Sequence, residues 1–243
     1  MSALSDYLDE AEAVIARVRE TQMERIARAA ELCARLIAED GLIHLFGSGH
    51  SRILVEETYP RYGSFPGFHP IVELSVTYHT QVVGANGQRQ AMFIERQSGL
   101  AEQILRNFEF GPNDAMMIFS SGGENAIAVE MAQGAKRLGM PVISLTTSRD
   151  CTLARLADIA LENGGIPGDA LVHIDGLETP VAPGSTVGGA IVVNALKAAV
   201  AEHLVALGKP PIVLTSPVFV GAERSRELFD ASYDDYRRRV RRL

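Results

Sequence analysis

The chain has 243 residues, of which 47% are hydrophobic and 22% are charged, a composition typical of a globular protein with an ample core. Its formal net charge of −7 argues against a general affinity for nucleic acid or for an anionic membrane, because both require a positive surface. The two cysteines, Cys33 and Cys151, are too few for a disulfide framework and show no metal-ligand spacing.

The N-terminal segment predicts a helix over residues 2–39 rather than a targeting sequence. Apolar residues recur there at spacings of three and four, and Gly41 ends the pattern. The segment lacks the basic and apolar regions of a signal peptide, and no apolar run approaches bilayer-spanning length, so we expect a cytoplasmic protein without membrane contact. So long a helix has more apolar face than one side of a sheet covers. We therefore expect residues 1–40 to contact a second copy in a homodimer or homotetramer.

Strand-like and helical segments alternate through the rest of the chain. β-type runs lie at 42–47, 70–76, 114–120, 141–147 and 158–163, with further candidates at 171–175 and 211–216. Helical patterns lie at 50–58, 99–109, 124–138, 185–207 and 223–242. This alternation predicts a single α/β domain, a three-layer α/β/α sandwich with a mostly parallel sheet. Residues 41–207 form its core and 208–243 a C-terminal strand and helix extension.

Three turns rich in hydroxyl groups follow predicted strands: "FGSGHS" (46–51), "FSSGGEN" (119–125) and "LTTSRDC" (145–151). Such turns meet at the carboxyl edge of a parallel sheet, where ligands of open α/β folds bind. Backbone amides and hydroxyls there can hold a phosphate or the hydroxyls of a sugar. Any one turn also fits plain helix capping, so the prediction depends on their recurrence.

Larger nucleotides fit this pattern poorly, because neither the dinucleotide fingerprint nor the nucleotide P-loop matches the chain. A small phosphorylated polyol is the expected ligand, with no cofactor. The predicted binding residues are Ser48, Gly49, His50, Ser51, Ser120, Ser121, Gly122, Glu124, Asn125, Thr146, Thr147 and Ser148.

The order of a Gly-Ser turn, an "SSG" turn and a "TTS…LA..AD" segment resembles the SIS (sugar isomerase) domain family. The resemblance covers about residues 42–207 and includes SIS-domain proteins of unassigned function. "GSGHS" and "EETYPRYG" are similar to segments of the phosphoheptose isomerase branch, and "APGSTVGGAIVVNAL" to the start of a helix that closes the site. The resemblance implies a flavodoxin-like sheet that binds phosphosugars.

Two departures from the family pattern affect the site that this resemblance implies. Phe119 and Glu124 stand where relatives carry hydroxyl groups, and a carboxylate beside a phosphate is unfavourable unless it points away or takes part in catalysis. Asn194 stands near the place of a zinc-ligating histidine in phosphoheptose isomerases. The resemblance therefore implies a site without a metal.

Aldose–ketose isomerisation needs a base to move a proton between C1 and C2, and an acid to open the sugar ring. Glu57, in the segment matched to phosphoheptose isomerases, is the first candidate for the base. His50 and His203 are candidates for the acid, although His50 also fits a helix cap and His203 a packed or surface group. Glu57 fits a solvated helix position equally well. A further carboxylate, Glu95, lies where relatives carry a short acidic loop.

The sequence thus predicts a phosphosugar-binding protein, with metal-independent aldose–ketose isomerisation as the first activity. A phosphosugar lyase or etherase, which removes an amine or ether substituent, uses similar carboxylates. A non-catalytic sensor that binds a phosphosugar and signals to a partner is the third possibility. The C-terminal "YDDYRRRVRR" pairs Asp and Arg at i and i+4, which indicates a charged helix face or a subunit contact rather than a nucleic-acid site.

Overall fold

Five parallel strands form the central sheet of the computed structural model, which describes residues 2–77 and 85–243. The strands are β1 (Ile43–Gly47), β2 (Phe68–Ile71), β3 (Ala115–Phe119), β4 (Val142–Thr146) and β5 (Ile159–Glu162). Their order is β2-β1-β3-β4-β5, which is the order of flavodoxin-like sheets. Strand order reverses between β1 and β3, where Ile43 pairs with Ala115 and Gly47 with Phe119.

Strand β2 differs from its predicted range of 70–76. It begins at Phe68, ends at Ile71 and is followed by the 3₁₀ turn η2 (Leu74–Val76). Pro70 lies inside it, which the fold tolerates because, among the described residues, β2 pairs with β1 alone and is an edge strand.

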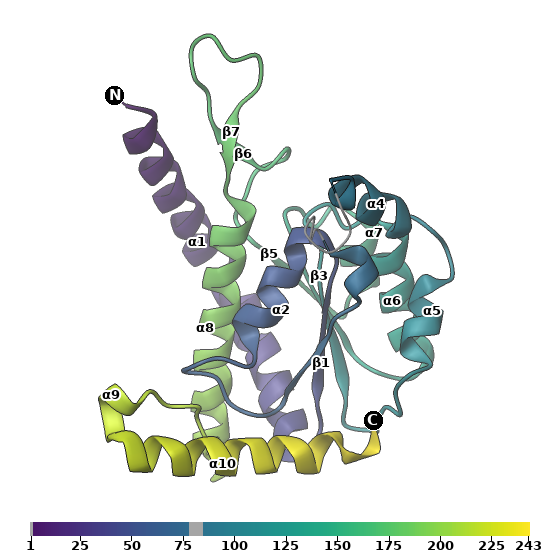
Figure 1. The fold of residues 1–243 in the computed structure, drawn as a ribbon, viewed down its shortest axis with the longest axis vertical. Helices are drawn as coiled ribbons and strands as arrows, with labels where there is room; N and C mark the ends of the chain where they lie inside the picture. The colour runs from purple at the N-terminus through teal and green to yellow at the C-terminus, as the bar shows by residue number, and fades with distance from the viewer. Residues whose placement is uncertain (1, 78–84) are drawn as a thin grey trace.

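Helices cover both faces of the sheet and confirm the predicted three layers (Figure 1). One face carries α1 (Ala3–Ala38), α2 (Arg52–Thr58, preceded by the 3₁₀ turn η1, Gly49–Ser51) and α8 (Ser185–Ala206). The other carries α4 (Gly87–Ile94), which was not predicted, with α5 (Leu100–Leu105), α6 (Ala126–Arg137) and α7 (Thr152–Leu156).

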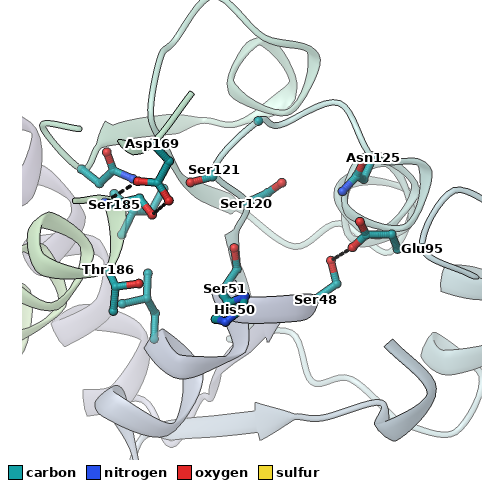
Figure 2. A pocket seen from close by; sticks show the side chains of 14 residues that line it. Ser48, His50, Ser51, Glu95, Ser120, Ser121, Asn125, Asp169, Ser185 and Thr186 are labelled. Carbon is teal, nitrogen blue, oxygen red and sulfur yellow. Dashed lines mark hydrogen bonds between the residues drawn. The ribbon is translucent and has the colours of Figure 1, made fainter. Parts of the chain in front are cut away.

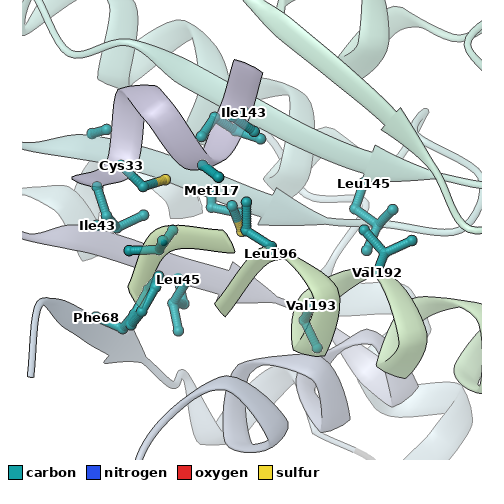
Figure 3. Packing of buried hydrophobic residues seen from close by; sticks show 14 of the residues in the cluster. Cys33, Ile43, Leu45, Phe68, Met117, Ile143, Leu145, Val192, Val193 and Leu196 are labelled. Carbon is teal, nitrogen blue, oxygen red and sulfur yellow. The ribbon is translucent and has the colours of Figure 1, made fainter. Parts of the chain in front are cut away.

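The two faces of the sheet bury separate apolar clusters. On the side of α1 and α8, Cys33, Leu196 and Val192 pack against Leu45 of β1 and Leu145 of β4 (Figure 3). The other cluster joins β1, β3 and β4 to α5, α6 and α7. All five residues of β1, of β3 and of β4 are buried, as expected for parallel strands covered on both faces.

Helix α8 is long and apolar enough, by length and composition, to cross a membrane. The expectation that no apolar run approaches this length is therefore wrong for α8. Its buried residues face α1, α2 and the sheet, which is the position of a core helix. The core helix of a soluble protein passes the same test of length and composition.

Glycines let the start of α8 approach its neighbours closely. A Cβ on Gly188 would lie 1.6 Å from the carbonyl oxygen of Asn163, and one on Gly189 would lie 2.7 Å from Leu54 of α2. The first turn of α8 is thereby held against the segment that follows β5.

The remaining elements lie at the two ends of the molecule (Figure 1). Strands β6 (Ala170–Val172) and β7 (Val181–Pro183) form an antiparallel hairpin outside the main sheet, and β7 was not predicted. Residues 211–216 form an irregular connection instead of the predicted strand. It leads to α9 (Pro217–Val220), α10 (Ala222–Arg239) and the 3₁₀ turn η3 (Val240–Arg242).

The C-terminal segment is tied to the sheet by a buried polar cluster. Arg242 donates to the Asp114 carboxylate, whose other oxygen lies 3.0 Å from Nε2 of His44. Asp114 also accepts from the amides of Leu42, at 2.9 Å, and Gly111, at 2.7 Å. Burial alone would raise the pKa of Asp114, but His44, Arg242 and the Gly111 amide lower it to about 2.

Candidate functional site

A polar cavity of about 180 Å³ opens at the carboxyl edge of the sheet, beside the point where strand order reverses. Its walls come from the turns after β1 and β3, the end of α4, the segment after β5 and the start of α8 (Figure 2). The volume is below the roughly 300–1,000 Å³ of drug-sized ligand pockets, so the cavity suits a small polar compound. Ligands of open α/β folds bind at such a reversal point.

The turn after β1 contributes Ser48, His50 and Ser51 to the cavity. Gly49, the fourth predicted residue of this turn, is buried and does not line it; its φ of +56° allows the chain to turn from strand to helix. The hydroxyl of Ser48 donates to Oε2 of Glu95 at 2.6 Å, which ties this turn to the end of α4.

The turn after β3 contributes Ser120, Ser121, Gly122 and Asn125, all of them predicted. The amide of Gly123 donates to the Ser120 hydroxyl at 3.2 Å, so the turn folds back on itself before α6 begins. A Cβ on Gly122 would meet no atom within 4 Å, which leaves that stretch of backbone open to a ligand.

Glu124 does not line the cavity, contrary to its predicted binding role. Its carboxylate turns outward and accepts from the amide and the hydroxyl of Thr152, each at 2.7 Å. The hydrogen bonds from the side chain and backbone of Thr152, with the charge of Arg155, lower the pKa of Glu124. The carboxylate therefore caps α7, and its charge points away from the place where an anion would lie.

The turn after β4 contacts residues that line the cavity. Thr146, Thr147 and Ser148 are not among its lining residues. Thr146 is fully buried and donates to the Ser148 carbonyl at 2.9 Å. The Thr147 hydroxyl lies 3.3 Å from that of Ser121 and accepts from Asn163, also at 3.3 Å. These three residues hold the turn in place, which is the structural alternative to binding.

Several lining residues were not predicted to bind the ligand: Leu54, Glu95, Leu145, Asn163, Asp169, Ser185 and Thr186. Asn163 follows β5 directly, so the rule that selected the three turns could have found it. Ser185 and Thr186 belong to the helix start that the family resemblance places over the site. Asp169 carries no such signal, because it lies in a long loop that only tertiary packing brings to the cavity.

Glu95 is the most buried carboxylate of the cavity, with 4% of its surface exposed. It caps the C-terminus of α4, and its own carbonyl accepts from the amide of Ile127 at 3.0 Å. This backbone hydrogen bond ties the end of α4 to the start of α6, and the Glu95 side chain lies beside Ser48 and Asn125 (Figure 2).

Glu57, the predicted base, is not among the lining residues of this cavity. It lies one turn beyond Leu54 on α2, where it accepts from Nδ2 of Asn194 at 2.7 Å and pairs with Arg61. Burial alone would raise the pKa of Glu57, but Asn194, Arg61 and the charge of Lys197 lower it. A carboxylate held ionised in this way is a weaker base.

His203 lies in the last turn of α8, while Ser185 and Thr186 line the cavity from its first turn. His203 lies 18 positions after Ser185 on this helix, which corresponds to about 27 Å at about 1.5 Å per residue. His203 therefore cannot reach the cavity of its own chain. Among residues 2–77 and 85–243, no group of three His, Cys, Asp or Glu side chains is arranged to hold a metal.

Comparison with protein families identifies residues 6–147 as a match to the model of the SIS domain. Two UPF0309 proteins, from Oceanobacillus iheyensis and Brucella anthropi, are each 31% identical to the chain. The first alignment covers 96% of this chain and 98% of the relative, and the second covers 97% and 98%.

Solved structures share the fold at low sequence identity. A phosphoheptose isomerase from Francisella tularensis superposes with a TM-score of 0.53 at 18% identity, covering 82% of this chain and 98% of its own. The sugar isomerase domain of an RpiR transcription factor from Sphaerobacter thermophilus has a TM-score of 0.50 at 18% identity, covering 95% and 97%.

Proposed function

The chain belongs to the SIS domain family, and from this premise we propose that its cavity binds a sugar phosphate and interconverts the aldose and ketose forms. The observation that supports the proposal most directly is the convergence of two hydroxyl-bearing turns with a buried carboxylate in one small polar cavity. Serine hydroxyls and open backbone amides suit an anion, and a carboxylate suits proton transfer.

In this proposal the phosphate lies between the turns after β1 and β3. The hydroxyls of Ser51, Ser120 and Ser121 border the same space (Figure 2). Gly122 also lines the cavity, and a Cβ there would meet no atom within 4 Å. The N-terminus of α6, a helix of 12 residues, adds a favourable dipole beside this space. The outward turn of Glu124 removes the one repulsive charge that the sequence placed in this turn.

Glu95 replaces Glu57 as the proposed base. It removes the C2 proton of an open-chain aldose, and the electron pair of that C–H bond forms the C1=C2 bond of an enediol as O1 takes up a proton. The proton on O2 then leaves as C2=O forms, and C1 takes up the proton from Glu95, so that the ketose has the same atoms as the aldose. His50 lines the same cavity and is the proposed acid for ring opening. Aldose–ketose isomerisation by these groups requires no metal, and the metal-free mechanism remains part of the proposal.

The experiment begins with a thermal-shift screen of the wild-type protein against a panel of sugar phosphates. A ligand present at about 100 times its dissociation constant adds about 2.7 kcal/mol of stability. Ligands found in this way are then tested for conversion by NMR. Binding without conversion of any ligand would support the sensor over the isomerase.

Substitution of carboxylates then assigns the base. We expect Glu95→Gln to lower turnover by about 10²–10⁴-fold while the sugar phosphate still binds. Glu57→Gln should keep turnover within a few-fold of wild type, and Glu102→Gln, an exposed position on α5 paired with Arg106, is the matched control. Normal turnover by Glu95→Gln would refute its assignment as the base.

A further inference from the structure

The N-terminus of α8 is already occupied by a carboxylate of the chain itself. Asp169 Oδ1 accepts from the amide of Ser185 at 2.7 Å and from that of Gly184 at 3.2 Å. Its Oδ2 accepts from the Ser185 hydroxyl at 2.8 Å. These donors are the groups that would otherwise hold an external anion at the start of a 22-residue helix.

The position of Asp169 is fixed by its backbone as well as by these bonds. Its φ is +63°, a left-handed conformation that aspartate adopts more readily than most residues. It directly precedes β6, and its carbonyl accepts from the amide of Gly184, which follows β7, at 3.1 Å. The base of the hairpin therefore fixes the carboxylate over the start of α8.

Asp169 also lines the cavity, at the side away from Glu95 (Figure 2). Glu95 lies beside Ser48 and Asn125, whereas Asp169 lies beside Ser185, with the serines of the two turns between them. The lining residues of this cavity, within the described part of the chain, include these two carboxylates and no lysine or arginine. A ligand that spans the cavity therefore meets a negative charge at either side.

We propose that Asp169 determines specificity, by admitting a sugar with one anionic group and rejecting one that carries a second anionic group at the α8 side. This inference rests on the proposed sugar-phosphate function of the same cavity. Two protein donors bind Oδ1 and one binds Oδ2, so Oδ2 keeps the capacity to accept from a sugar hydroxyl. A phosphate in that place would face a fixed carboxylate, with the helix donors already in use.

The test compares fructose 6-phosphate with fructose 1,6-bisphosphate by isothermal titration calorimetry. We expect the wild-type protein to bind the bisphosphate at least tenfold more weakly than the monophosphate. Asp169→Asn removes the charge while its amide oxygen can still accept from Ser185, and asparagine also tolerates positive φ. This variant should reduce the discrimination between the two ligands to about threefold or less.

Asp150→Asn is the matched control, because Asp150 is 96% exposed, pairs with Arg155 and is not among the residues lining the cavity. It should discriminate as the wild type does. A second measurement uses the wild-type protein alone: discrimination by charge should weaken as salt is raised, since salt screens it.

The outcomes separate this inference from the proposed function. Equal affinity of wild type for both ligands, or full discrimination retained by a folded Asp169→Asn variant, would overturn the role of Asp169 and leave the sugar-phosphate site standing. Discrimination in the wild type that does not change with salt would overturn it as well. Failure of the wild type to bind either fructose phosphate, or any other in the panel, would overturn the function and the inference together.

Discussion

His69 makes the stability of the fold depend on pH in a defined window. Its Nδ1 lies 2.7 Å from the Tyr236 hydroxyl, and its ring stacks on Tyr236 and contacts His44 and Phe108 edge-on. Burial lowers the pKa of His69 from 6.5 to about 4, and the nearby His44 and Arg242 add to this effect against the charge of Asp114.

The sign follows from the protons bound in each state. Between about pH 6.5 and pH 4 the unfolded chain protonates His69 and the folded chain does not, so acid favours unfolding. One pKa unit corresponds to about 1.4 kcal/mol, so acidification through this window should remove about 3 kcal/mol of stability. The stability that Asp114 contributes is lost in a more acidic range, as pH falls from its ordinary 3.8 through about 2.

The assay is urea unfolding followed by circular dichroism at pH 7.5 and pH 4.5, at one protein concentration. His69→Gln removes the titrating group and keeps an amide that can bond to Tyr236, so its loss of stability between the two pH values should be about 2–3 kcal/mol smaller than that of wild type. His173→Gln, at an exposed hairpin position, is the matched control and should follow wild type. An identical loss of stability in wild type and His69→Gln would refute the reasoning.

Three further predictions test packing and assembly. Gly188→Ala should destabilise the protein by at least about 2 kcal/mol in urea unfolding, because its Cβ would clash with the Asn163 carbonyl; a change within 0.5 kcal/mol would contradict the close approach of α8. Asp114→Asn should cost about 3–5 kcal/mol in the same assay, since it leaves the buried end of Arg242 without its counter-charge, and a near-neutral effect would show that the ion pair is dispensable. Leu8, 56% exposed on α1, is a candidate subunit contact: Leu8→Glu should reduce the mass measured by light scattering, and an unchanged mass would exclude a contact at this point.

The sequence was sufficient to identify the cavity-lining turns that follow the buried strands β1 and β3. Ser48, Ser51, Ser120 and Ser121 were found because a hydrophobic run ends directly before each turn, and parallel strands end at one edge of a sheet. The sheet and its helices followed from the same periodicity. The first and last residues of β2 could not be predicted from this periodicity, because an edge strand with a proline lacks the continuous apolar run of a central strand.

The sequence pattern could not identify residues that reach the cavity from segments distant in the chain. Asp169 reaches it because the hairpin of β6 and β7 packs on α1, where Leu171 and Val172 contact Val14. Neither periodicity nor a strand end marks such a residue. The same limit applies to β7, whose three residues, Val181 to Pro183, form a strand only because β6 lies beside them.

The choice between Glu57 and Glu95 shows why residue type and local spacing do not identify a base. Both glutamates lie on helices near the carboxyl edge of the sheet, and the sequence favoured Glu57 for its place in a matched segment. The two glutamates differ in the side chains that contact them in the folded protein. Helix α8 presents Asn194 and Lys197 to Glu57, and these groups stabilise its ionised form outside the cavity. Glu95 instead accepts from the Ser48 hydroxyl inside the cavity, next to the space that the ligand would occupy.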